Sequence, residues 1–143
     1  MTTINTAEIL SRASHVQGLK IRLLHKSGAV FDGDPILFLH GSSFPSALAA
    51  DFKIDNFSWM DHLVTHQRDV FALDFLGFGH SDRYPEMSNG SQKLVGRAVS
   101  AAEDLNLAVE FIRKMTGKIA SFSLLIRGVV QWLHSTQENF QTK

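Results

Sequence analysis

The chain has 143 residues, the usual size of one domain and enough to bury a hydrophobic core. Its 14 basic and 14 acidic residues balance, which argues against nucleic acid or an anionic membrane as partners, and the lack of cysteine excludes disulfides, thiolate catalysis and cysteine metal sites. The N-terminus is unlike a signal peptide and no run approaches the roughly 18 apolar residues of a membrane span, so we expect a soluble, cytoplasmic protein.

The first predicted strand covers residues 15–25, where apolar and polar residues alternate imperfectly, as in a strand with one wet face. We expect this strand to be peripheral. Turn-forming residues then flank a short apolar segment at 29–31, which indicates a hairpin or a brief second strand. The unbroken apolar run at 36–39 lies between two turn signals and predicts a central strand, buried on both faces.

A second apolar strand with its own glycine turn follows at 69–81, and a helix is predicted between the two strands. The helix begins at Ser58-Trp59-Met60-Asp61, and its apolar face holds Trp59, Met60, Leu63 and Val64. Two strands joined by a helix are almost always parallel neighbours with a right-handed crossover. We therefore expect the strands at 36–39 and 69–81 to run in the same direction.

After a polar loop at 82–92, apolar residues recur at three- and four-residue spacing from Ala98 to Met115 and predict a long amphipathic helix. Ser100 and Glu103 match a capping box at its start, although Leu94 and Val95 would allow an earlier start, and Gly117 is a typical stop. A further strand begins near 118–126. The residues expected to face away from the sheet are Glu103, Asp104, Glu110, Arg113 and Lys114.

At this point the sequence resembles the N-terminal half of an α/β-hydrolase over about residues 16–125. The resemblance lies in the strand that ends in His40-Gly41, the aromatic helix, and the pattern Asp74-x-x-Gly77-x-Gly79-x-Ser81. It implies an α/β fold with a mostly parallel sheet and flanking helices, truncated before the nucleophile elbow. Residues 1–125 would form the N-terminal part of such a domain, and residues 126–143 an atypical tail.

In that family, the loop after the third strand gives one backbone N–H to the oxyanion hole. Carried over to this sequence, the donors are the main-chain N–H groups of Ser42 and Ser43, while His40 and Gly41 shape the loop. Such donors stabilise the negative oxygen of a tetrahedral intermediate, and losing one costs about 3 to 4 kcal/mol. We expect structural roles for Asp74, Gly77 and Gly79, with the glycines making a tight turn. The alternative for 40–43 is an ordinary turn at a strand end.

Two other patterns are weaker candidates for chemistry. Gly79-His80-Ser81 looks like the opening of the motif G-x-S-x-G, but Asp82 and Arg83 follow where a small turn and a glycine are needed, so we do not assign Ser81 as the nucleophile. His62 and His66 are four residues apart on the predicted helix, yet a third ligand is missing and we read them as surface residues. We predict no metal and no cofactor.

The resemblance implies a part of a serine esterase- or lipase-like hydrolase with a small-molecule substrate. The catalytic serine, acid and histidine are missing, so we expect this chain to be inactive and to aggregate or self-associate. One alternative is an epoxide hydrolase or dehalogenase with an aspartate nucleophile, whose Gly-x-Asp-x-Gly motif is also absent. Another is a non-enzymatic α/β domain that binds a small molecule at its strand ends.

The tail at 126–143 stands where an elbow would be expected, and we propose that it results from a reading-frame shift near Leu125. With free choice of third bases, the sequence from Ile126 onward can be re-read in another frame as Asp-Ser-Trp-Gly-Gly-Ser-Val-Ala-Ala-Phe, which contains most of an elbow. The alternative is a genuine amphipathic helix with Val129, Val130 and Trp132 among its apolar residues. DNA that fails to encode Ser-x-Gly in the alternative frame would contradict the shift.

Overall fold

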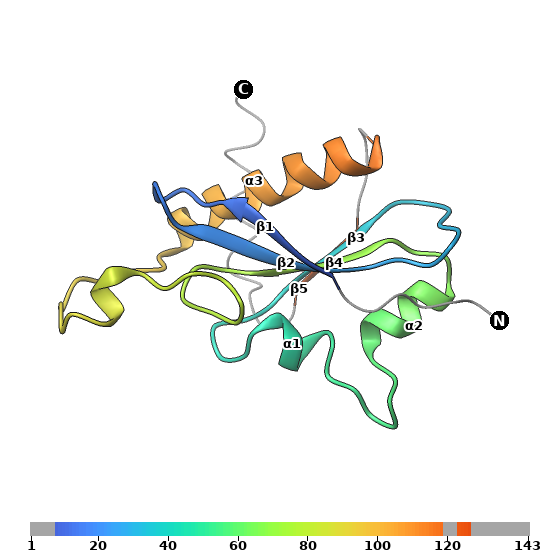
Figure 1. Cartoon of the computed structure of the whole chain (residues 1–143), viewed down its shortest axis with the longest axis horizontal. Helices are drawn as coiled ribbons and strands as arrows, with labels where there is room; N and C mark the ends of the chain where they lie inside the picture. The colour runs from blue at the N-terminus through green and yellow to red at the C-terminus, as the bar shows by residue number, and fades with distance from the viewer. Residues whose placement is uncertain (1–7, 119–122, 127–143) are drawn as a thin grey trace.

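The computed structural model describes residues 8–118 and 123–126 (Figure 1). Five strands lie in these ranges: β1 (Glu8–Ala13), β2 (Lys20–Lys26), β3 (Ile36–Leu39), β4 (Val70–Asp74) and β5 (Ser123–Ile126). The helices are α1 (Ser46–Ala49), α2 (Trp59–Thr65) and α3 (Ala98–Thr116), and a short 3-10 turn covers Pro85–Met87. Residues 127–143 of the predicted tail lie outside the described residues.

The strands form one sheet in the order β1-β2-β4-β3-β5. β2 pairs antiparallel with both β1 and β4, whereas β3 pairs parallel with both β4 and β5. It follows that β2 alone among the five described strands runs against the other four, so the expected mostly parallel sheet is confirmed. The parallel pairing of β3 and β4 also confirms the predicted strand, helix, strand unit.

Helices cover both faces of the sheet, with α3 on one side and α1 and α2 on the other (Figure 1). Side chains alternate between these faces because successive residues of a strand point in opposite directions. The core under α3 contains Ile21, Leu23, Leu37, Leu39, Phe71 and Leu73 from the sheet and Leu105, Ala108, Val109 and Ile112 from the helix. The opposite core contains Leu24, Phe38, Val70 and Ala72 with Ala50, Met60 and Val64.

The ends of the helices follow local sequence signals in two of the three predicted cases. Ser58 caps α2 with the reciprocal hydrogen bonds of a capping box to Asp61, and Gly117 ends α3 with φ of 68°, where a side chain would be strained. The helix α3 begins at Ala98, the first residue of the predicted apolar pattern, but the predicted capping box of Ser100 and Glu103 is wrong. Its N-cap is Arg97, without a side-chain cap, and Gly96 at φ 66° prevents a helical extension back to Val95.

The N-terminal strands differ from the prediction. β1 is not among the predicted strands, and its presence places β2 inside the sheet instead of at the periphery. The polar residues at the end of β2 are buried with partners: His25 is 2.6 Å from the Asp69 carboxylate, and Lys26 pairs with Asp51 and Asp61. Residues 29–31 form an exposed connection and no strand.

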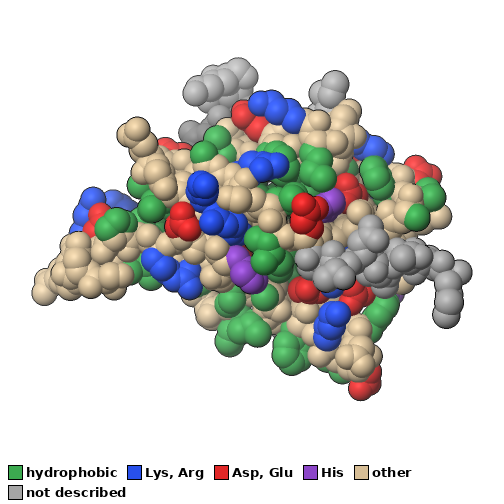
Figure 2. Space-filling view, in the orientation of Figure 1, with side chains coloured by type: hydrophobic (Ala, Val, Ile, Leu, Met, Phe, Trp, Pro, Cys, Tyr) green, Lys and Arg blue, Asp and Glu red, His purple; other side chains and the backbone are tan. Residues whose placement is uncertain are grey.

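Large hydrophobic side chains remain exposed along the segment that contains α1 and leads to α2. In Figure 2 hydrophobic side chains emerge along the lower rim, where Figure 1 places α1. The exposed residues of this segment are Phe44, Leu48, Phe52, Ile54, Phe57 and Trp59. Within the described ranges no helix is long and apolar enough to cross a membrane.

Candidate functional site

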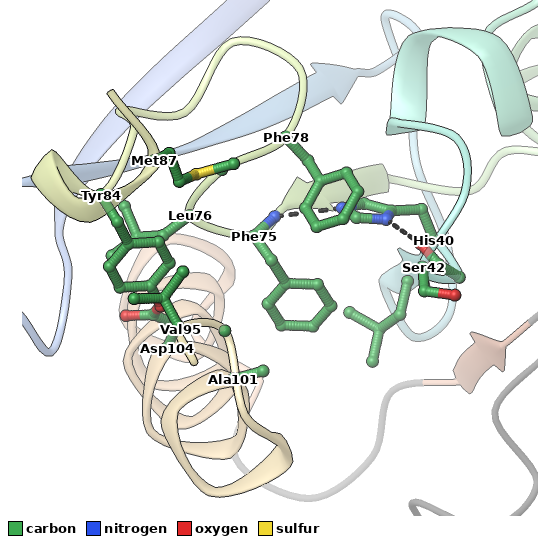
Figure 3. Close-up of a pocket in the computed structure, with 14 residues that line it drawn as sticks. His40, Ser42, Phe75, Leu76, Phe78, Tyr84, Met87, Val95, Ala101 and Asp104 are labelled. Atoms are coloured by element: carbon green, nitrogen blue, oxygen red, sulfur yellow. Dashed lines mark hydrogen bonds between the residues drawn. The ribbon is translucent and has the colours of Figure 1, made fainter. Parts of the chain in front are cut away.

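A cavity of about 430 Å³ opens where β3 and β4 end, beside the N-terminal half of α3. Most of its wall is apolar, and Figure 3 shows the side chains that line it. The lining residues are Leu39, His40, Gly41, Ser42, Phe75, Leu76, Gly77, Phe78, Tyr84, Met87, Val95, Gly96, Ala101 and Asp104. Ligands commonly bind in such a place, outside the carboxyl ends of parallel strands.

His40 joins the two strand ends that frame the cavity. It is 2% exposed, and its Nε2 lies 3.2 Å from the main-chain N of Phe75, while Nδ1 lies 2.5 Å from the carbonyl oxygen of Gly41 (Figure 3). A main-chain N–H can only donate and a carbonyl can only accept, so Nδ1 carries the proton and Nε2 accepts. Since both ring nitrogens are engaged, His40 orients the loop and has no free lone pair with which to act as a base.

Ser42 and Ser43 follow this histidine on the exposed rim. Ser42 lines the cavity, whereas Ser43 is not among the lining residues. Within the described residues, no main-chain carbonyl accepts from the N–H of Ser42. The structure therefore brings Ser42, but not Ser43, to the cavity wall.

The turn after β4 is built around the buried carboxylate of Asp74. Its Oδ1 accepts from the main-chain N–H of Ser46 at 2.8 Å, and its Oδ2 accepts from the N–H of His80 at 3.0 Å. Gly79 has φ of 49°, and a Cβ there would lie 2.7 Å from Oδ1 and closer still to the other carboxylate atoms. A side chain at this position would therefore displace Asp74.

Gly77 lies in the same turn with φ of 91° and donates its N–H to the carbonyl of Asp82 at 2.9 Å. Only glycine tolerates such an angle without strain. The turn thus connects β4 to α1 through Asp74 and Ser46, and it aligns the loop that carries Phe75 and Phe78 along the cavity.

Ser81 faces the sheet and does not line the cavity. It is 5% exposed, its hydroxyl donates to the carbonyl of Asp74 at 2.5 Å, and its Oγ accepts from the N–H of Arg22 at 2.7 Å. A nucleophilic hydroxyl needs access to substrate and a base to take its proton. The geometry agrees with our decision not to assign Ser81 as the nucleophile.

The end of the cavity away from Ser42 is polar at one point, Asp104 of α3 (Figure 3). The expectation that this side chain faces solvent is wrong, because it is 1% exposed. Its Oδ1 accepts from the main-chain N–H of His15 at 2.7 Å. Burial, and secondarily the negative charge of Asp104, raises the pKa of the neighbouring Tyr84.

The sequence contains a signal for Asp104 that the prediction leaves unused. Asp104 lies three residues after Ala101 and four before Ala108, and thus within the apolar stripe of α3. The cavity residues Phe75, Phe78, Tyr84 and Met87 carry no comparable signal, because they lie in loops without periodicity.

His62 and His66 are both exposed on α2 or at its end, with ring centroids 4.5 Å apart. No group of three or more potential ligands for a metal ion occurs in the part of the chain that the structure describes. Their assignment as surface residues agrees with this exposure.

No family model and no curated protein matches this sequence. Solved structures do match its fold. The haloalkane dehalogenase DatA from Agrobacterium tumefaciens has a TM-score of 0.60 and 18% identity, covering 93% of this chain and 37% of that one. An epoxide hydrolase from Vigna radiata has a TM-score of 0.54 and 19% identity, covering 92% and 36%.

A thioesterase domain from the curacin biosynthetic pathway also matches, with a TM-score of 0.53 and 14% identity, covering 86% of this chain and 36% of that one. These structures are α/β-hydrolases, and the present chain has the same fold over its described part. It spans about a third of the length of the solved structures that it matches. Because the names of the three denote different reactions, the fold alone does not select one.

Proposed function

We propose that this chain supplies the oxyanion-binding side of an α/β-hydrolase that cleaves esters of small, largely apolar acids. The observation that carries the proposal is the main-chain N–H of Ser42, a residue on the wall of an apolar cavity beside a loop held by His40. A serine nucleophile that attacked a carbonyl carbon would push the π electron pair onto the carbonyl oxygen. A donor held in place before the reaction stabilises that oxygen without further reorganisation.

The residues around the donor support its pre-organisation. His40 fixes the carbonyl of Gly41, the residue immediately before Ser42, and ties it to the N–H of Phe75 on the neighbouring strand end. Asp74 holds the following helix α1 through the N–H of Ser46. The loop at 40–46 is thus anchored on both sides of the proposed donor, which keeps the N–H in one position.

We expect this chain alone not to turn over esters, because no Gly-x-Ser-x-Gly motif occurs in its sequence. Binding of the acid part of a substrate is the activity that remains testable. Hexanoate carries a negative oxygen on an apolar chain, and 1-hexanol has the same chain with a neutral head. The ratio of their affinities measures how strongly the site prefers an oxyanion.

The test compares Ser42→Pro with the matched control Ser43→Pro by isothermal titration. Proline removes the N–H, and neither serine has a positive φ that proline could not adopt. Losing a hydrogen bond to a charged group costs roughly 1.5 to 3 kcal/mol, so Ser42→Pro should weaken hexanoate binding about 10- to 100-fold and leave 1-hexanol unchanged. Ser43→Pro should keep the preference. Equal hexanoate binding by wild type and Ser42→Pro would reject the proposal.

A second candidate is an epoxide hydrolase or dehalogenase with an aspartate nucleophile. The names of two of the matched structures favour it, since one is a haloalkane dehalogenase and another an epoxide hydrolase. The residue at the nucleophile elbow distinguishes the two candidates: serine supports ester cleavage, and aspartate supports the second candidate. If a longer intact form of this protein had neither residue, a small-molecule-binding domain without catalysis would be the better assignment.

A further inference from the structure

The carboxylate of Asp104 has one oxygen without a hydrogen-bond partner among the described residues. Oδ1 accepts from the N–H of His15 at 2.7 Å, and the Nδ1 of the same histidine lies 2.9 Å from Oδ1. Oδ2 is fully buried and, within the described ranges, has no partner. A buried carboxylate oxygen without a donor is costly, and such groups in native proteins usually have a reason.

Among the described residues that line the cavity, no side chain donates a hydrogen bond to this oxygen. The residues that line the cavity together with Asp104 include the apolar Val95, Ala101 and Met87. In Figure 3 Tyr84, Val95 and Asp104 gather at one end of the cavity, and His40 and Ser42 lie at the other. The cavity therefore has a polar point at each end and an apolar middle, formed in part by Phe75 and Leu76.

A structural role accounts for only one of the two carboxylate oxygens of Asp104. One acceptor oxygen is enough to hold the N–H of His15, and an asparagine would provide it equally well. The negative charge also faces the imidazole of His15, whose Nδ1 lies 2.9 Å from the same Oδ1. Oδ2 takes part in neither contact, so among the described residues it is left for a positively charged or hydrogen-bond-donating group that enters the cavity.

We propose that Asp104 binds the ammonium group of a ligand whose acyl oxygen lies at Ser42. This inference rests on the proposed function and specifies the substrate class, namely esters of amino-substituted acids with an apolar chain between the two ends. The ammonium would donate to Oδ2, pair its charge with the buried carboxylate, and leave Oδ1 bound to His15.

The test uses the full chain and two probes with the same apolar part, n-hexylammonium and 1-hexanol, at pH 7. Isothermal titration should show hexylammonium binding roughly 10-fold or more tightly than hexanol, since hydrogen bonds to charged groups are worth more than neutral ones. Asp104→Asn should remove this preference, while its amide oxygen still accepts from the main-chain N–H of His15. Glu103→Gln is the matched control, because it removes the same charge from the adjacent, exposed position on α3 and should change nothing.

Amide NMR of the unmutated chain decides the matter if Asp104→Asn fails to fold. Hexylammonium should shift the amides around Ala101 and Asp104, whereas hexanoate should shift that of Ser42. If hexylammonium binds no better than hexanol, or binds without affecting 101–104, the inference about Asp104 is wrong. If hexanoate also fails at Ser42, the proposed function fails with it, so the two outcomes are distinguishable.

Discussion

Gly79 is the residue at which a single added methyl group should do the most damage to the site. Alanine at φ 49° costs about 1 to 2 kcal/mol in backbone strain alone. Its Cβ would also overlap the carboxylate of Asp74, which accepts hydrogen bonds from Ser46 and His80. Losing one of these bonds to a charged group adds roughly 1.5 to 3 kcal/mol. We therefore expect Gly79→Ala to lower the free energy of unfolding by about 2.5 to 5 kcal/mol.

Gly90→Ala is the control for the backbone strain. Gly90 has φ of 72°, and no atom lies within 4 Å of the place that a Cβ would occupy, so this variant should lose only about 1 to 2 kcal/mol. Urea unfolding followed by circular dichroism measures both variants. If Gly79→Ala costs no more than Gly90→Ala, the clash with Asp74 does not matter and our account of the turn is wrong.

A double-mutant cycle isolates the clash itself. Asp74→Ala removes the carboxylate that the new methyl group would meet, so Gly79→Ala should cost only its backbone strain in that background. The coupling energy between the two substitutions should then be about 1.5 to 3 kcal/mol. Additive effects would mean that the two residues do not interact.

Ser81→Ala should leave the hydrolysis of p-nitrophenyl esters at the background rate of the unmutated chain, and burst kinetics that require Ser81 would contradict this. The same substitution should cost about 1 to 3 kcal/mol of stability, because the main-chain groups of Arg22 and Asp74 lose their hydrogen-bond partner. Burial disfavours the charged form of Asp61, but Lys26 and Ser58 outweigh this effect and lower the pKa of Asp61. The protein should therefore lose the stability of the Lys26–Asp61 pair as pH falls below 3.8. Asp61→Asn should reduce this acid-induced loss of stability, whereas the control Glu103→Gln should keep it. An unchanged acid limb of unfolding would refute that assignment. The exposed side chains around Phe52 and Trp59 should bind an apolar dye and favour self-association, whereas a dye-free monomer by light scattering would show otherwise.

The central β-α-β unit is predictable because its signals are local. The apolar run of β3, the Ser58 capping box and the Gly117 stop each lie within a few residues, and all three are present. The prediction misplaces β2 for the opposite reason. Its polar residues His25 and Lys26 are buried only because Asp69, Asp51 and Asp61 reach them from distant parts of the chain.

The residues of the candidate site also divide into those that a local pattern predicts and those that depend on distant parts of the chain. Resemblance to a family points to the loop at 40–43, and the structure places His40 and Ser42 on one cavity. Asp104 is assigned to the solvent face when α3 is treated as an isolated helix. Its burial depends on the loop around His15, which lies 89 positions away in sequence and donates to its carboxylate.

The amide of Ser42 gives the most direct test of whether this chain has an oxyanion site. In a ¹⁵N-labelled sample, hexanoate should move the Ser42 amide proton downfield and saturate, because the N–H gains a charged acceptor. The same concentration of 1-hexanol should shift the resonances of Phe75 and Phe78 but leave the Ser42 amide nearly unchanged. If hexanoate binds and the Ser42 amide does not respond, the main-chain N–H is not the donor and the central claim is wrong.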